Sequence, residues 1–212
     1  MTSSGAKSTL WLIGDSDIQR WSTEWLPSYD GNVVVKGYSG ATLQEVVSHA
    51  MEHITPCDDD GNNMANSSFA CPSNTLILCA GENDIGRGCS LDETLESLNG
   101  LFRWKNREQP TPRVVLLGPK LEPWLTDDPA SRKKYVKMSK AMERACRNQE
   151  AVFVDCLTMF CEQESAEQPG AVWGGRAHAD PQYFDPDQLH LNSAGYAVWK
   201  RVVDEILGKS MN

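Results

Sequence analysis

Five short, nearly continuous apolar segments recur along this chain, and they constrain its fold more than any other feature. They cover residues 10–13, 32–36, 75–80, 113–117 and 151–154. The intervening segments place apolar residues at helical spacing, chiefly over residues 42–51, 91–105, 130–148 and 193–207. Strands without polar alternation are typical of a parallel sheet that is covered by helices on both faces. The sequence therefore predicts an α/β fold.

The segments that follow the first three strands are rich in glycine and polar residues. They are Gly14-Asp-Ser16, Gly37-Tyr-Ser-Gly40 and Gly81-Glu-Asn-Asp84. Right-handed crossovers bring the carboxyl ends of parallel strands to one edge of the sheet, where ligands usually bind. We therefore expect Ser16, Gly40 and Asn83 to lie close together although they are far apart in the sequence.

Composition excludes several classes of function. The 212 residues suit a single domain over 1–212, and 20 basic against 29 acidic residues give a net charge of −9. Such a chain is poorly suited to bind nucleic acid or anionic membranes without specificity. No apolar run approaches the roughly 20 residues of a membrane span, and residues 1–8 lack a signal-peptide pattern, so we expect a cytoplasmic protein. The oligomeric state stays open.

Ser16 is the first candidate for chemistry. It stands between the first strand and a short helix expected at 18–21, where the N–H groups of a helix start favour developing negative charge. A nucleophilic serine fits this position. The alternative is a serine that only caps the helix, which the segment by itself favours.

Four histidines supply the candidate bases. His190 has Asp187 three residues before it, so that the carboxylate can fold back onto Nδ1 and leave Nε2 free as a base. His178, with Asp180 nearby, is a second candidate in a segment with less to hold it. His49 and His53 lie four residues apart, as zinc ligands often do, but we interpret them as a solvated helix face because no third ligand is evident.

Seven cysteines cannot all pair within one chain. Cys79, Cys146 and Cys156 lie in apolar segments and are expected to be reduced core residues. Cys57 and Cys71 flank an acidic insert at 58–68, which a disulfide between them could close. None of the spacings is typical of a zinc site, so no metal is expected.

Together, Gly14-Asp-Ser16, Ser39-Gly40, Gly81-x-Asn83-Asp84 and Asp187-x-x-His190 resemble the SGNH (GDSL-like) hydrolase family in order and extent. The resemblance implies a three-layer α/β/α, flavodoxin-like fold with strand order 2-1-3-4-5, and ester hydrolysis without a cofactor. It implies that Ser16 is the nucleophile, His190 the general base and acid, and Asp187 the residue that orients it. The N–H groups of Ser16 and Gly40 and the amide of Asn83 would form the oxyanion hole. Asp17 is a departure, since many members carry Leu there.

The expected substrate is a small-molecule ester with a small to medium acyl group. The resemblance leaves open a carbohydrate O-deacetylase, a thioesterase and a lysophospholipase. A non-catalytic flavodoxin-like module, with Gly14-Asp-Ser16 as an anion site, is the alternative outside the hydrolases. The side chains that could line an acyl pocket are aromatic and lie near expected loops: Trp21, Trp124, Trp173, Tyr183 and Phe184.

Overall fold

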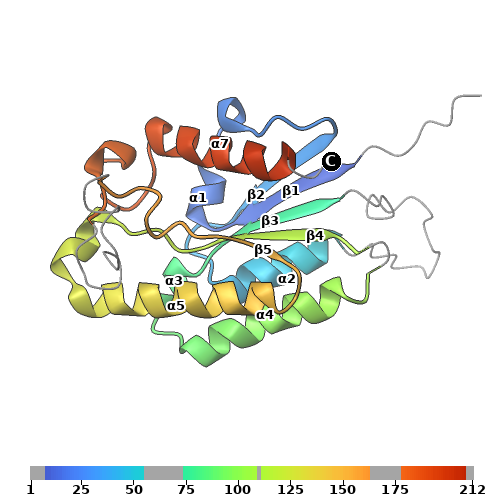
Figure 1. Cartoon of the computed structure of the whole chain (residues 1–212), viewed down its shortest axis with the longest axis horizontal. Helices are drawn as coiled ribbons and strands as arrows, with labels where there is room; N and C mark the ends of the chain where they lie inside the picture. Colours follow the sequence, from blue (N-terminus) through green and yellow to red (C-terminus); the bar gives the residue numbers. More distant parts are fainter. Residues whose placement is uncertain (1–7, 55–73, 109–110, 163–177, 209–212) are drawn as a thin grey trace, which may run out of the picture.

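A five-stranded parallel sheet forms the centre of the computed structural model, which describes residues 8–54, 74–108, 111–162 and 178–208 (Figure 1). The strands lie in the order β2-β1-β3-β4-β5. Their bounds are β1 Thr9–Gly14, β2 Asn32–Gly37, β3 Thr75–Cys79, β4 Arg113–Leu117 and β5 Val152–Val154. The α/β class, the parallel sheet and the strand order expected from the sequence are confirmed.

The central strands are apolar because both of their faces are covered. Every residue of β3 is buried, and in β1 Leu10, Leu12 and Ile13 are fully buried. β2 lies at the edge of the sheet, and its residues are half-buried or exposed. This difference follows from position, because an edge strand has one neighbour and less cover.

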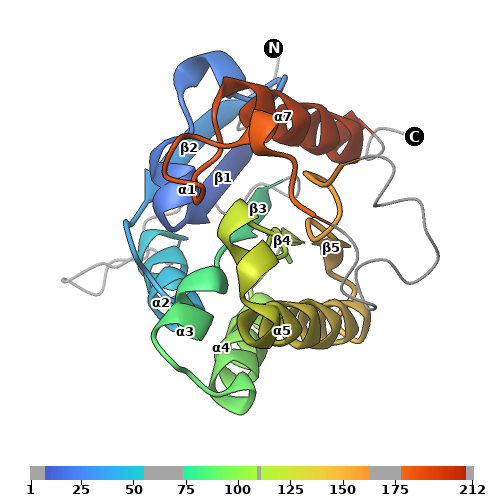
Figure 2. The ribbon, with the colours of Figure 1, turned by 90° about the vertical axis from the view of Figure 1, so that its left-hand side faces the viewer.

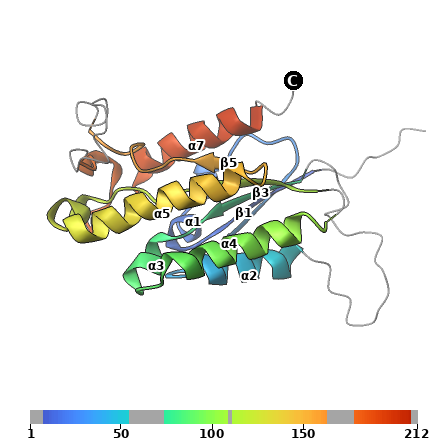
Figure 3. The ribbon, with the colours of Figure 1, turned by 60° about the horizontal axis from the view of Figure 1, so that its bottom comes forward.

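Helices cover the sheet on two sides. In Figure 1, α7 lies on one face with the short α1, whereas α2, α4 and α5 lie on the other face, which comes forward in Figure 3. The helix bounds are α1 Ser16–Gln19, α2 Leu43–Ile54, α3 Glu82–Gly86, α4 Leu91–Lys105, α5 Pro129–Arg147 and α7 Ser193–Gly208. Short 3₁₀ turns occupy η1 Thr23–Trp25, η3 Pro123–Asp127 and η4 Pro181–Tyr183. The three layers match the expected architecture.

Local capping explains where several helices begin. The Ser90 and Glu93 side chains satisfy each other's backbone N–H groups at the start of α4. Before α2, the N–H of Thr42 donates to Glu45 Oε2 at 2.7 Å. Asn192 Oδ1 accepts from the backbone N–H groups of Ala194 and Gly195, which fixes the entry of α7.

The first helix departs from the sequence-based prediction. It was expected over 18–21, but α1 begins at Ser16. Asp15 is its N-cap, with Oδ1 accepting from the N–H of Asp17 at 3.1 Å. The interpretation of Ser16 as a helix-capping serine is therefore wrong, because the preceding carboxylate takes that position and leaves the Ser16 hydroxyl to other partners.

Other expectations concern cysteines and membranes. Cys79, Cys146 and Cys156 are free and buried, as predicted. Cys57 and Cys71 lie outside the described residues, as do the acidic insert and Trp173. Among the helices that the structure describes, none is long and apolar enough to cross a membrane.

Candidate active site

The turn between β1 and α1 holds Ser16 at the carboxyl edge of the sheet, the end seen in Figure 2. Gly14 allows the close approach, because a Cβ at this position would lie 2.5 Å from the carbonyl oxygen of Cys79 on β3. Asp15 then donates its backbone N–H to that same carbonyl at 3.1 Å. The turn is thereby attached to the central strand, and Ser16 is left half-buried at the first position of α1.

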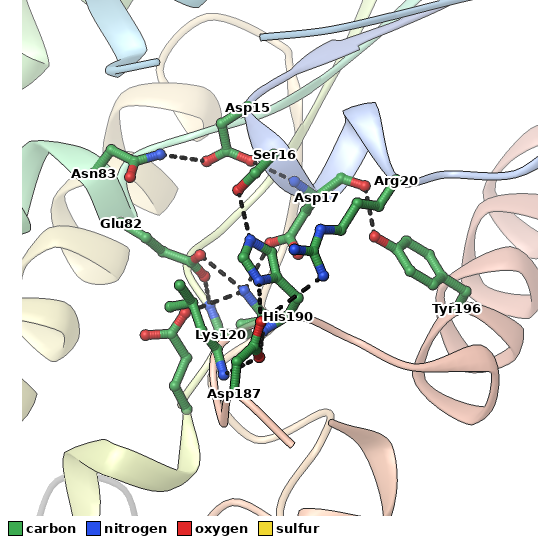
Figure 4. A network of polar contacts seen from close by, with 12 residues as sticks. Asp15, Ser16, Asp17, Arg20, Glu82, Asn83, Lys120, Asp187, His190 and Tyr196 are labelled. Carbon is green, nitrogen blue, oxygen red and sulfur yellow. Dashed lines mark hydrogen bonds and ion pairs between the residues drawn. The ribbon is translucent and has the colours of Figure 1, made fainter. Parts of the chain in front are cut away.

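A second segment brings His190 to the same place (Figure 4). His190 Nε2 lies 3.1 Å from Ser16 Oγ, and His190 Nδ1 lies 2.6 Å from Asp187 Oδ2. Asp187 Oδ1 accepts from the backbone N–H groups of Leu189 and His190, each at 3.0 Å. The carboxylate therefore folds back onto the histidine that follows it, as the spacing predicted, and this arrangement leaves Nε2 facing the hydroxyl.

The loop that carries this pair is closed at its base. Phe184 and Leu191 form an antiparallel bridge, and the N–H of Asp185 donates to the carbonyl of His190 at 2.8 Å. Gln188 adopts a left-handed backbone with φ of 59°, which a non-glycine residue enters at some cost. That turn lets Asp187 reach the N–H groups ahead of it. The loop geometry explains why an exposed segment can hold a histidine in position.

Asn83 and Gly40 approach from the segments after β3 and β2. Asn83 Nδ2 donates to Asp15 Oδ2 at 3.2 Å and to the carbonyl of Ala41 at 3.1 Å. Gly40 has a positive φ of 72°, and within the described chain neither its N–H nor that of Ser16 donates a hydrogen bond. An oxyanion near Ser16 would compete with one of the Asn83 bonds, so this amide is positioned at the site without being free.

The two aspartates beside these segments differ in role. Asp15 is buried, and burial together with the neighbouring Asp17 raises its pKa to about 7. Asp84 accepts from the N–H of Leu43 at 2.8 Å and from Thr94 Oγ1 at 3.1 Å. Asp84 therefore connects the segment after β3 to α2 and α4.

A buried ion-pair network beside the serine was not predicted. Lys120 Nζ lies 2.6 Å from Asp17 Oδ2, 2.8 Å from Glu82 Oε2 and 3.3 Å from Glu122 Oε1. Burial by itself would lower the pKa of Lys120, but the three carboxylates hold it well above its ordinary value. Burial raises the pKa of Glu82 despite the lysine. The available signal was that Asp17, Glu82 and Lys120 stand three residues after the ends of β1, β3 and β4.

These groups share one cavity of about 420 Å³. Among the described residues that line it are Ser16, Asn83, Lys120, Glu122, Trp124 and His190. Of the aromatic residues considered for the pocket, Trp124 lines it. The expectation is wrong for Trp21 and Phe184, which are buried in the core: Trp21 stacks on Trp199, and Phe184 packs edge-on against Phe160. Tyr183 likewise packs on Phe160, outside the described lining.

The other histidines lie elsewhere. His49 Nδ1 is 3.3 Å from Glu52, and His53 Nε2 is 2.5 Å from the Tyr38 hydroxyl, on the exposed side of α2. Within the described residues, the group close enough to hold a metal is Asp15, Asp17 and Cys79, all buried, and His49 and His53 are not part of it. Burial raises the pKa of the Cys79 thiol well above its ordinary value.

The sheet order and the serine, histidine and aspartate at its carboxyl edge together define an SGNH-type hydrolase fold. The chain matches the model of the GDSL-like Lipase/Acylhydrolase family over residues 3–198, and it belongs to this family.

Solved structures share the fold at low sequence identity. An acetylxylan esterase from Geobacillus stearothermophilus, solved as a catalytic mutant, is 17% identical, with a TM-score of 0.64 over 98% of this chain and 97% of that one. A GDSL-like lipase from Bacteroides thetaiotaomicron is 17% identical, with a TM-score of 0.66 over 97% and 90%. A member of the lipolytic G-D-S-L family from Veillonella parvula is 14% identical, with a TM-score of 0.66 over 95% and 99%. Among curated proteins, none is significantly similar in sequence.

Proposed function

We propose that this chain is a serine esterase that hydrolyses carboxylic esters with small to medium acyl groups through an acyl-enzyme on Ser16. The observation that carries the proposal is the continuous line of hydrogen-bond distances from Ser16 Oγ to His190 Nε2 and from His190 Nδ1 to Asp187. A serine hydroxyl is a weak nucleophile until an adjacent base removes its proton during attack. His190 is the base that lies within reach.

The reaction then proceeds in two halves. Ser16 Oγ attacks the ester carbonyl carbon while its proton moves to His190 Nε2, and the alcohol leaves with that proton. Water attacks the acyl-enzyme in the same way and releases the acid. Asp187 keeps the proton on Nδ1 and stabilises the imidazolium that forms between the two transfers.

The oxyanion formed in each half needs fixed donors. We assign this role to the backbone N–H groups of Ser16 and Gly40 and to the Asn83 amide. Asp15 and Ala41 hold the Asn83 amide from one side, and the oxyanion would take over one of these hydrogen bonds. Each such donor is worth about 2.7–4 kcal/mol in comparable sites.

Acyl length is limited by the chemistry of the pocket. Its wall combines the apolar Trp124, Pro186 and Leu189 with the charged Lys120, Glu82 and Glu122, and a long alkyl chain gains about 0.8 kcal/mol per buried CH₂ only where it meets apolar surface. We therefore assign acetyl to about hexanoyl esters as substrates. Acetylated sugars are a natural first group to assay, since an acetylxylan esterase has this fold.

The test is covalent labelling. Incubation of the protein with a fluorophosphonate should add its phosphonyl group to the peptide that contains Ser16, as read by mass spectrometry. The Ser16→Ala variant should stay unlabelled and should lose turnover of p-nitrophenyl acetate by at least about a thousandfold while its circular dichroism is unchanged. A labelled site elsewhere, or activity in Ser16→Ala within tenfold of the wild type, would remove Ser16 as nucleophile.

A further inference from the structure

The buried ion-pair network around Lys120 has no part in the mechanism given above. Within the described residues, Lys120 Nζ contacts Asp17, Glu82 and Glu122, and none of these four side chains makes a hydrogen bond to Ser16 Oγ or His190. All four nevertheless line the cavity that contains Ser16 and His190 (Figure 4 shows Lys120, Asp17 and Glu82 beside the histidine). Their position calls for an explanation in terms of the substrate.

Stability does not explain these charges. The side chain of Lys120 is 1% exposed and that of Asp17 is 2% exposed, and a buried ion pair is often no more stabilising than apolar residues of similar size. Asp17 Oδ1 is also buried, and among the described residues it has no hydrogen-bond partner. An acceptor left in this state costs stability, which is tolerated mostly at functional positions.

The network is rich in acceptors relative to donors. Three carboxylates surround one ammonium, and Glu122 Oε2 further accepts from Trp124 Nε1 at 2.7 Å and from the Tyr135 hydroxyl at 3.0 Å. An alkyl group placed against the charged part of this wall would displace water from it and would offer it no hydrogen bond. A group with hydroxyl or ammonium hydrogens would instead find an acceptor in Glu82, the most exposed side chain of the network at 14%, next to the buried Asp17 Oδ1 that has no partner among the described residues.

We infer that the Lys120 network is a specificity determinant that makes this site prefer esters carrying a hydrogen-bond-donating group over plain alkyl esters. The inference rests on the proposed function, since it concerns the substrate of the same serine. Asp17 directly follows the nucleophile and Lys120 follows β4. Under this inference, both residues determine the substrate preference without taking part in bond formation or cleavage. Trp124, with 39% of its surface exposed, borders the same cavity and is held by Glu122.

The test compares matched esters. The alcohol arm pairs glyceryl monoacetate with propyl acetate, and the acyl arm pairs p-nitrophenyl 3-hydroxybutyrate with p-nitrophenyl butyrate. The wild type should favour the hydroxylated member of at least one pair by about tenfold or more in kcat/KM, since a site built for a donor rejects the analogue that lacks it. The arm that shows the preference identifies which side of the ester meets the network.

The decisive variant is Asp17→Leu combined with Lys120→Met. It removes one charge of each sign, so the net charge of the site is unchanged. The preference for the hydroxylated ester should fall to about twofold or less, with a gain on the alkyl ester. The matched control is Asp204→Leu with Lys200→Met, which removes an ion pair of 2.7 Å on α7 and should leave the preference unchanged.

A milder variant keeps the inference testable if the double variant does not fold. Glu122→Gln removes one carboxylate and retains the size of the side chain, and it should reduce the preference by about threefold. Fluorophosphonate labelling of each variant shows separately whether Ser16 remains reactive. A loss of the nucleophile's reactivity is thereby distinguished from a loss of the substrate preference. Labelled variants with the wild-type preference, or a wild type that favours the alkyl esters, would overturn the inference.

Discussion

Two carboxylates flank Ser16, and their surroundings shift their pKa values in opposite directions. Asp187 has a side chain that is 42% exposed, and hydrogen bonds from the His190 ring and backbone hold its pKa well below the ordinary value. Asp15 is 1% exposed, and burial raises its pKa to about 7. The same functional group is therefore a permanent anion on one side of the nucleophile and a titrating acid on the other. Environment, and not residue type, decides which of the two can orient a base.

The two carboxylates also differ in how they are held in place. Asp187 acts on Ser16 through His190 from an exposed loop, whereas Asp15 is bonded to the main chain of Asp17 and to the Asn83 amide inside the sheet edge. The exposed loop supplies Asp187 and His190, which act in proton transfer. The buried edge of the sheet supplies Asp15 and Asn83, which are held in fixed positions by hydrogen bonds. The following substitutions test that division.

Removing the base should have the largest effect. His190→Ala should lower kcat/KM for p-nitrophenyl acetate by at least about a thousandfold, because no other group in the described pocket lies within hydrogen-bond distance of Ser16 Oγ to accept its proton. His178→Ala is the matched control and should cost less than tenfold, since His178 does not belong to the described lining of the cavity. The opposite ranking would assign the base to His178 and would leave the nucleophile unaffected.

Neutralising the exposed carboxylate should come next. Asp187→Asn should lower kcat by about a hundredfold or more, because an amide no longer fixes the proton on His190 Nδ1 or stabilises the imidazolium. Asp185→Asn is a suitable control, since Asp185 forms an ion pair with Arg20 at 3.3 Å on the same loop without touching His190 through its side chain. Equal losses in the two variants would mean that loop charge matters and that the Asp187 orientation does not.

The Asp15 side of the site is tested by removing the Asn83 amide, which donates to Asp15. Asn83→Ala should lower kcat by about a hundredfold with little change in KM, as expected when a donor acts only on the transition state. Steady-state kinetics on p-nitrophenyl acetate measures both constants. A change confined to KM would make Asn83 a substrate-binding residue, and the Asp15 side of the comparison would then concern binding instead of catalysis.

The sequence predicted the features that local patterns determine. Local residue patterns predict apolar strands that end at or just before Gly14, Gly37 and Gly81. The crossover rule then places Ser16 and Asn83 together. The Lys120 network could not be predicted in this way, because Asp17 and Lys120 are 103 residues apart and their contact depends on the shapes of two turns.

The start of α1 and the place of the aromatic residues were missed for similar reasons. Asp15 and Ser16 are both good helix caps, and only the hydrogen bond from the Asp17 N–H to the Asp15 carboxylate decides between them. Trp21 is a candidate for the pocket from the sequence because it is aromatic and lies near an expected loop. In the folded chain it stacks on Trp199 of α7 with ring centroids 5.5 Å apart, a contact between distant segments that hydrophobic spacing does not reveal.

The smallest expected effect concerns stability and tests the Asp15 side directly. The pKa of Asp15 rises on folding from an ordinary value near 3.8 to about 7, so the folded state binds the proton more tightly. Its contribution to stability is present below pH 4 and is lost as the pH rises to 7. Asp15→Asn removes this titration. The Tm of the variant should therefore fall less than that of the wild type between pH 4 and 7, by ~3 °C or more.

The control for this measurement is Asp128→Asn. Asp128 is also an aspartate N-cap, at the start of α5, but hydrogen bonds from Ser131 and Ala130 lower its pKa, so it stays ionised throughout the same window. Its substitution should lower the Tm by a similar amount at pH 4.5 and at pH 7 and leave the slope unchanged. A wild-type slope in Asp15→Asn would mean that Asp15 is ionised across this range. The two carboxylates beside Ser16 would then differ in exposure but not in charge.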